Sequence, residues 1–138
     1  MPEDANVLGS VFGGRVMALI DKAGAIVAIR HCRASVVTAS VDSIDFISPL
    51  KLGDIMSFQG RISQVFSSSL EVRVDVYGEE ASTGIRKLTT TAFVTMVCLD
   101  ADGRPQQAPP LLVENAEDRA EAAEAGRRRE LRLARRRG

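Results

Sequence analysis

The sequence lacks the features that mark several common protein classes. It carries no net charge, because 18 Lys and Arg residues balance 18 Asp and Glu residues. A general nucleic-acid binder is normally basic overall, so we expect no nucleic-acid partner. No apolar run approaches the ~20 residues that span a bilayer, and the first residues lack the basic and then apolar layout of a signal peptide. These absences favour a cytoplasmic protein with no membrane span. The length of 138 residues is about enough for one domain.

Residues that bind metals or attack substrates are also scarce. There are two cysteines, Cys32 and Cys98, which form no disulfide framework and are expected as reduced thiols, and one histidine, His31. No C-x-x-C or H-x-x-x-H spacing occurs, so we expect no metal site. The G-x-S-x-G, phosphate-loop and dinucleotide motifs are absent too, which disfavours a Ser-His-Asp hydrolase and a nucleotide cofactor. We interpret His31 as a capping or surface residue at the end of a helix.

One apolar helix is predicted over residues 15–31, directly after Gly13-Gly14. Apolar residues recur there at spacings of three and four, the period of an amphipathic helix: Val16, Leu19, Ile20, Ala23 and Val27. Further apolar residues occupy the other faces, so the segment is apolar on nearly every side. Such a helix is expected to be buried.

Four long strands are predicted after the helix. They cover residues 36–47, 56–63, 70–77 and 88–99, and the third shows the clearest alternation of apolar and polar residues. Ser67, Ser68 and Ser69 are the predicted connection between the second and third strands. Short connections between long strands imply an antiparallel sheet. Since the helix offers little polar surface, either the sheet curls around it or a second molecule covers it.

The C-terminal tail differs in composition from the rest. Residues 101–110 contain a turn and three prolines, and residues 114–138 contain six acids and eight arginines. We therefore divide the chain into a domain over residues 1–113 and a charged helical tail over residues 114–138. Because this helix is polar on every side, we expect it to be mostly exposed, either solvated or lying on a partner.

Two features near the predicted helix suggest chemistry. Gly13 and Gly14 are expected to open the helix, where free N–H groups can bind an oxyanion, although two glycines also suit a simple tight turn. Asp21 lies in the middle of the apolar helix, where a carboxylate needs a partner or a function, and we favour a function over a solvated carboxylate beside Lys22. Asn6 by itself indicates only a turn or cap.

Together these residues resemble a known family, the acyl-CoA thioesterases of the hotdog superfamily. The resemblance covers nearly the whole chain and rests on Asn6, Gly9, Phe12-Gly13-Gly14, Met17, Asp21, residues 26–32, 36–42 and 91–95, Phe46, and the turn at residues 102–104. It implies an α+β hotdog fold, in which a curved antiparallel sheet wraps around a central helix, here with an added charged C-terminal helix. The departures are Val11-Phe12, where some members carry a histidine, and an unusually arginine-rich tail.

The resemblance also implies an activity. Such an enzyme hydrolyses fatty acyl-CoA to a free fatty acid and coenzyme A (CoA), and it needs no cofactor apart from the CoA of its substrate. Asp21 is then the catalytic carboxylate, Asn6 assists it, and the amides of Gly13 and Gly14 polarise the thioester carbonyl. The family further implies a homodimer that assembles into a trimer of dimers, with Asn6 and Asp21 of one site supplied by different copies. The arginines of the tail would touch a neighbouring subunit or attract the anionic CoA.

The CoA phosphates need donors near the edge of the sheet. The candidates are Arg61, Ser67, Ser68, Ser69, Arg86 and Lys87, each of which is also compatible with an ordinary surface position. Two other functions remain as alternatives. A non-catalytic acyl-CoA-binding hotdog domain would lack the carboxylate at Asp21, and a hotdog dehydratase would need a catalytic histidine away from His31.

Overall fold

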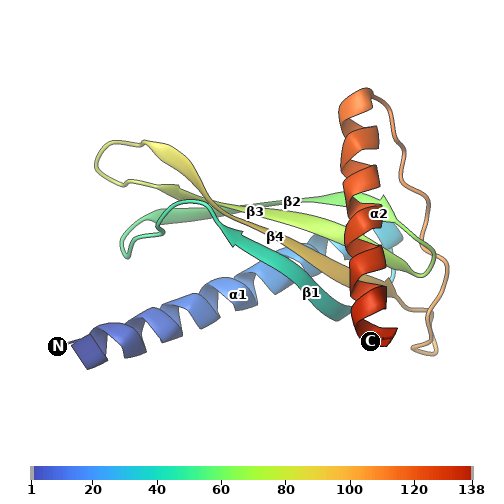
Figure 1. The fold of residues 1–138 in the computed structure, drawn as a ribbon, viewed down its shortest axis with the longest axis horizontal. Coiled ribbons are helices and arrows are strands. Elements are labelled where there is room, and N and C mark those ends of the chain that lie inside the picture. The colour runs from blue at the N-terminus through green and yellow to red at the C-terminus, as the bar shows by residue number, and fades with distance from the viewer. Residues whose placement is uncertain (1, 138) are drawn as a thin grey trace.

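The computed structural model describes the backbone of residues 2–137 and the side chains of residues 13–136. A long helix comes first, four strands follow, and a second helix ends the chain (Figure 1). The elements are α1 (Pro2–Cys32), β1 (Val36–Phe46), β2 (Ile55–Val65), β3 (Ser69–Glu79), β4 (Arg86–Cys98) and α2 (Ala116–Arg137). The four strands predicted from the sequence are confirmed, with ends that differ by one or two residues.

The strands form one antiparallel sheet in the order β1-β4-β3-β2. The serine-rich connection between β2 and β3 is confirmed as a tight turn, in which the Phe66 N–H donates to the Ser69 carbonyl at 2.9 Å. The edge strand β1 carries two register shifts against β4, between Thr38 and Ser40 and between Val41 and Ser43. Bulges of this kind bend a strand and increase its twist, so they curve this edge of the sheet.

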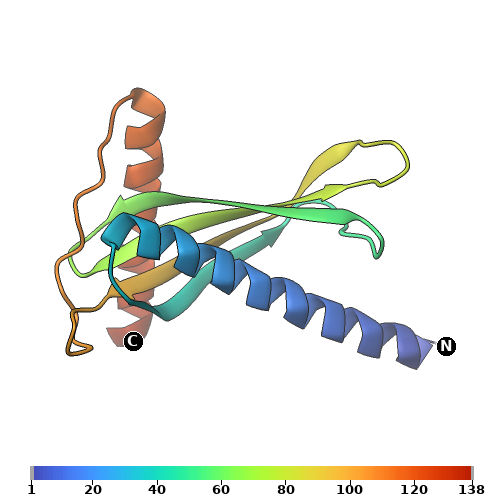
Figure 2. The ribbon, with the colours of Figure 1, turned by 180° about the vertical axis from the view of Figure 1, so that it is seen from behind.

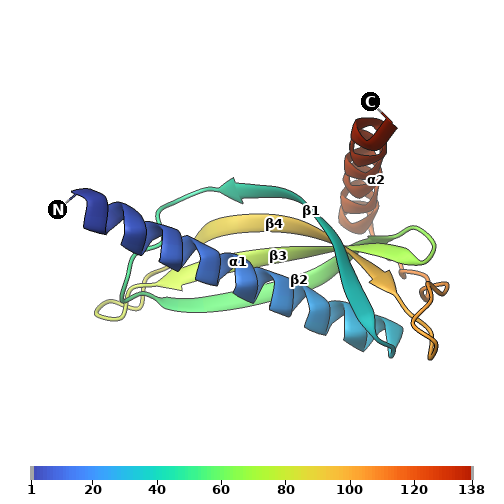
Figure 3. The ribbon, with the colours of Figure 1, turned by 90° about the horizontal axis from the view of Figure 1, so that it is seen from below.

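One face of the sheet packs against α1 (Figure 3). The alternating residues of β3 and β4 that point to this face are fully buried: Leu70, Val72, Val74, Val76, Ala92, Val94, Met96 and Cys98. The helix adds Val16, Ile20 and Ala28 to the same core. Gly60 of β2 allows close contact, because a Cβ there would lie 2.7 Å from Cγ2 of Val27. The expectation of a curved antiparallel sheet around a long helix is therefore confirmed.

The opposite side of α1 is not covered by the sheet. Met17, Leu19, Ile26 and Ile29 are 36–47% exposed in the single chain. Val37 and Val41 of the neighbouring edge strand are exposed as well. An apolar surface of this kind, on a helix and a strand edge together, is typical of an interface.

The start of α1 differs from the sequence prediction. The helix begins at Pro2 rather than after Gly14, so Gly13 and Gly14 lie within it. Proline suits the first position of a helix and acidic residues suit its first turn, and Pro2-Glu3-Asp4 provides both. These signals outweigh the two glycines, each of which costs a helix about 1 kcal/mol.

The helix α2 covers the outer face of the sheet, opposite α1 (Figure 2). Asn115 caps its start by accepting a hydrogen bond from the Asp118 N–H at 2.8 Å. The expected helix is confirmed, but the expectation that it is mostly exposed is wrong for the face that carries Ala122 and Ala125, which are buried. Neither helix within residues 2–137 has both the length and the hydropathy needed to cross a bilayer.

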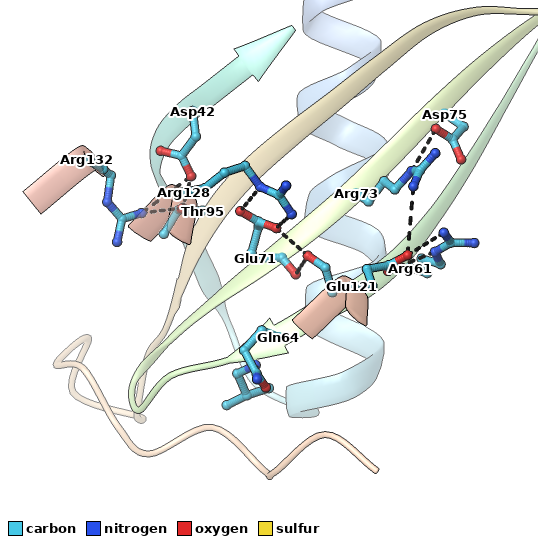
Figure 4. A network of polar contacts seen from close by, with 12 residues as sticks. Asp42, Arg61, Gln64, Glu71, Arg73, Asp75, Thr95, Glu121, Arg128 and Arg132 are labelled. Atoms are coloured by element: carbon cyan, nitrogen blue, oxygen red, sulfur yellow. Dashed lines mark hydrogen bonds and ion pairs between the residues drawn. The ribbon is translucent and has the colours of Figure 1, made fainter. Parts of the chain in front are cut away.

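Ion pairs attach α2 to the sheet (Figure 4). Arg128 donates to both carboxylate oxygens of Glu71, at 2.7 and 2.9 Å, and Glu71 is only 1% exposed. The Arg128 guanidinium also stacks 3.6 Å from the centre of the Phe93 ring. Further along, Arg132 contacts Asp42 at 3.6 Å. The sequence prediction missed this docking because the outward residues of β3 look like an ordinary solvated face.

Candidate active site

The site is built around a hydrogen bond between α1 and β1. The hydroxyl of Thr38, on the edge strand, donates to Oδ1 of Asp21 at 2.6 Å. The same hydroxyl lies 3.4 Å from Sδ of Met96, a fully buried residue of β4. Thr38 therefore holds one oxygen of a half-buried carboxylate in a fixed direction and leaves the other oxygen for a ligand.

Thr38 was missed as a site residue by the sequence analysis. It lies in the segment 36–42 that carries part of the family resemblance, but a threonine in a β-branched strand is typical of any sheet. Its role depends on the register of β1 and on the position of α1 across the sheet. The periodicity of the sequence gives neither of these.

The structure does not show Gly13 and Gly14 as free donors. Inside a continuous helix, their N–H groups donate to carbonyl groups four residues earlier. Each glycine is nevertheless open on its side-chain face, where a Cβ would have no neighbour within 4 Å. Asn6 lies in α1, but its side chain is outside the described residues.

One helix cannot bring these residues to a single reaction centre. Gly13 and Asp21 are separated by about 12 Å along the axis of α1, at ~1.5 Å per residue. Asn6 is farther still from Asp21. An oxyanion donor and a catalytic carboxylate must both lie within ~3 Å or so of the reacting atoms.

The candidate CoA-binding residues do not form one cluster in this chain. Ser67, Ser68 and Ser69 lie at the turn between β2 and β3, whereas Arg86 and Lys87 begin β4 at the opposite end of the sheet. The 11 residues of β3 connect the two ends, and at ~3.3 Å per residue this separates them by about 33 Å.

Arg61, the sixth candidate, contacts α2. Its guanidinium donates to both carboxylate oxygens of Glu121, at 3.0 and 2.5 Å, and this hydrogen bonding raises the pKa of Arg61 above its ordinary value (Figure 4). The side chain thus holds α2 on the sheet in the single chain. A phosphate group at this position would have to compete with Glu121.

The histidine and the cysteines have structural surroundings. Nε2 of His31 lies 2.7 Å from the carbonyl oxygen of Pro109. This contact connects the end of α1 to the segment before α2. Cys32 and Cys98 are free and buried, and burial together with the neighbouring Cys98 thiol raises the pKa of Cys32 to about 12. A thiol of this kind stays protonated and unreactive at neutral pH. Among the residues that the structure describes, no group of three or more His, Cys, Asp or Glu side chains is placed to hold a metal ion.

Comparison with known proteins identifies the family. The family model of the thioesterase superfamily matches residues 8–85. An uncharacterized acyl-CoA thioester hydrolase of Bacillus subtilis is 41% identical over 117 residues, which are 85% of this chain and 68% of that protein. The chain belongs to the thioesterase superfamily.

A second relative is larger. The cytosolic acyl coenzyme A thioester hydrolase of Homo sapiens is 36% identical over 136 residues, which are 93% of this chain but 35% of the human protein. The chain thus spans about a third of the length of that relative.

Two solved structures have the same fold. An apo-hexameric acyl-CoA thioesterase superposes with a TM-score of 0.82 at 38% identity, covering 89% of this chain and 79% of that one. The acyl-CoA hydrolase of Staphylococcus aureus, in complex with butyryl coenzyme A and coenzyme A, gives a TM-score of 0.81 at 38% identity, covering 90% and 76%. The expected hotdog fold is confirmed.

The S. aureus hydrolase has also been crystallised with single alanine substitutions of an asparagine, an aspartate and a threonine. The spacing between these three positions equals the spacing between Asn6, Asp21 and Thr38 in this chain.

Proposed function

We propose that this thioesterase hydrolyses acyl-CoA to a free carboxylic acid and CoA, with Asp21 as the catalytic carboxylate. The observation that carries the proposal is the 2.6 Å hydrogen bond from Thr38 to Asp21. A carboxylate on an apolar helix, fixed at one oxygen and open at the other, is suited to act on a bound water or carbonyl. The matching spacing of the substituted residues in the S. aureus hydrolase supports the same pair and adds Asn6.

The chemistry needs few groups. As a general base, Asp21 takes a proton from water while the water oxygen bonds to the thioester carbon. The C–S bond then breaks, and the CoA thiolate leaves and takes up a proton. As a nucleophile, the Asp21 carboxylate bonds to the thioester carbon and expels the CoA thiolate, and water then hydrolyses the resulting anhydride to the free acid and the Asp21 carboxylate. Asn6 orients the water or the carbonyl, and the open side-chain faces of Gly13 and Gly14 leave room for the thioester beside α1, since their N–H groups are bonded within the helix.

The site is shared between two copies of the chain. Asn6 precedes Asp21 by 15 residues, about 22 Å along α1 at ~1.5 Å per residue, so one site can use both residues only if they come from different helices. The exposed apolar side of α1 and the edge strand β1 provide a surface through which two chains can meet. We propose a homodimer that assembles into a trimer of dimers, which the hexameric relative supports.

The alternative is a hotdog domain that binds acyl-CoA without hydrolysing it. The Asp21–Thr38 pair argues against this alternative, because binding alone needs no oriented carboxylate. The human relative is named as a cytosolic enzyme, which supports the cytoplasm as the location.

A direct assay separates catalysis from binding. The protein is incubated with a panel of acyl-CoA thioesters, and a thiol reagent detects released CoA. We expect turnover by the wild type, loss of about a hundredfold or more in Asp21→Asn, and normal turnover in the control Asp45→Asn, an exposed carboxylate of β1. Binding of acyl-CoA without release of thiol would favour the non-catalytic alternative.

Mixing two inactive variants tests whether the site is shared. Asn6→Ala and Asp21→Ala are combined under conditions in which labelled subunits are seen to exchange. Mixed dimers contain one site with both residues intact, so a fraction of wild-type activity should return. Absence of any recovery despite exchange would place both residues of a site on one chain.

A further inference from the structure

An apolar cavity lies beside the Asp21–Thr38 pair. Its volume is about 450 Å³, and it is bounded by the N-terminal half of α1, the end of β1 and the loop before β2. Val16, Ile20 and Thr90 form its buried floor. The half-buried Ile44 and Leu50 form its walls.

The cavity lies about one helical turn from the candidate catalytic carboxylate, which does not itself line it. Met17, at the rim and 47% exposed, precedes Asp21 by one helical turn on the same face of α1. Side chains with this spacing have Cβ atoms about 5–6 Å apart. An acyl group whose carbonyl carbon is held at Asp21 would therefore begin about one helical turn from the residues that line the cavity.

The shape of the cavity indicates its occupant. Along α1 it runs from Gly13 to Ile20, which is about 10 Å of helix. Its lining is mostly hydrocarbon, and Ser48 and Thr90 are the lining residues with polar side chains. An apolar space about 10 Å long that starts one helical turn from a catalytic carboxylate suits an alkyl chain.

We propose that this cavity holds the acyl chain of the substrate, and that Ile44 and Leu50 set the chain length that is accepted. The inference rests on the proposed function and deepens it, because it assigns the selectivity of the same site. Chains longer than the cavity pass out over the exposed Phe46 at its rim. The competing occupant is an apolar side chain of a second copy of the protein.

The wall residue Ile44 allows the cavity to be changed in both directions. Ile44→Phe shortens the space and Ile44→Ala extends it, whereas Ile55→Phe, an exposed position on β2 outside the cavity, is the matched control. The measured quantity is kcat/KM for acetyl-, octanoyl- and palmitoyl-CoA. Activity on acetyl-CoA reports that each variant is folded and that the catalytic residues are intact.

We expect Ile44→Phe to lower the octanoyl-to-acetyl ratio of kcat/KM by about tenfold or more. Ile44→Ala should move the optimum toward palmitoyl-CoA, and Ile55→Phe should leave the ratios unchanged. Unchanged ratios in both Ile44 variants would overturn the proposal while leaving the hydrolase function intact. A changed assembly state with unchanged ratios would assign the cavity to a second copy of the protein and overturn it too.

A binding measurement separates the cavity from the catalysis. Calorimetric titration with octanoate should show binding to the wild type and to Asp21→Asn but at least tenfold weaker binding to Ile44→Phe. If the wild type hydrolyses no acyl-CoA but shows this binding pattern, the proposed function fails and the cavity assignment stands. Equal octanoate affinity in the wild type and Ile44→Phe would overturn the assignment.

Discussion

Arg128 of α2 and Glu71 of β3 form a bidentate ion pair between the C-terminal helix and the sheet, with N–O distances of 2.7 and 2.9 Å. Glu71 also accepts a hydrogen bond from the Ser63 hydroxyl at 2.5 Å. A carboxylate that is 1% exposed depends on these partners, because water cannot replace them. The helix and the sheet face are therefore coupled through a buried charge.

Removing one partner of this pair should destabilise the fold. Arg128→Met leaves Glu71 buried without its cation, and we expect a loss of about 3–5 kcal/mol in the free energy of unfolding, measured by urea titration. Arg127→Met is the matched control, because Arg127 lies on the surface, where it pairs with the exposed Glu124, and its loss should leave the free energy of unfolding nearly unchanged. Equal effects of the two substitutions would show that the buried pair does not hold α2 in place.

The double variant Glu71→Gln with Arg128→Met refines this test. It removes the buried charge together with its partner, so much of the stability lost in Arg128→Met should return. A double variant no more stable than Arg128→Met would contradict the coupling, since the loss would then come from the packing of Arg128 on Phe93.

The Thr38 hydroxyl should matter for turnover rather than for folding. Thr38→Val keeps the shape of the side chain and removes the donor to Asp21, so we expect kcat to fall roughly tenfold, in line with a lost hydrogen bond of ~1–3 kcal/mol. Thr38→Ser retains the hydroxyl and should keep most of the activity. Steady-state kinetics on one acyl-CoA measures both, and equal kcat in the Val and Ser variants would remove Thr38 from the mechanism.

The strands could be predicted from the sequence because each has its own pattern. Residues 70–77 alternate apolar and polar side chains, and in the structure the apolar side chains are buried against α1. The polar residues of the same alternation suggest a solvent-exposed face, although α2 covers part of it. Glu71 and Arg128 are 57 positions apart, and nothing local to either residue indicates that they meet.

In the candidate site too, one residue could be predicted from the sequence and another could not. Asp21 could be found because a carboxylate is unusual within an apolar helix. Thr38 could not be found, since a threonine is common in a strand and its contact with Asp21 requires the fold. Gly13 and Gly14 suggest a helix start, but the proline and the acidic residues at positions 2–4 are stronger start signals, and α1 begins there.

The Cys32 thiol predicts a pH dependence of stability. Burial and the adjacent Cys98 raise its pKa from 9.0 to about 12, so the folded state favours the protonated thiol. This contribution is present below pH 9 and is lost as the pH rises toward 12, because the unfolded chain releases the proton first. At pH 10 the loss is about 1 kcal/mol.

The measurement compares wild type with Cys32→Ala. Urea midpoints taken between pH 8 and pH 10 should fall more steeply for the wild type than for the variant, since other groups titrate in both. A native thiol that reacts at neutral pH as fast as a free cysteine would contradict the raised pKa.

Close contact between α1 and β2 depends on Gly60. A Cβ at this position would lie 2.7 Å from Cγ2 of Val27, on a branched side chain that has few alternative rotamers in a helix. Gly60→Ala should therefore destabilise the protein by about 1–3 kcal/mol through overpacking, measured by urea titration. Adding Val27→Ala removes the methyl group that the new Cβ would contact, so the double variant should be more stable than Gly60→Ala alone.

Gly126→Ala is the control, because its Cβ meets nothing within 4 Å and should stabilise α2 by about 0.5–1 kcal/mol. If Gly60→Ala were as harmless as Gly126→Ala, α1 would have to lie farther from β2 than the structure places it.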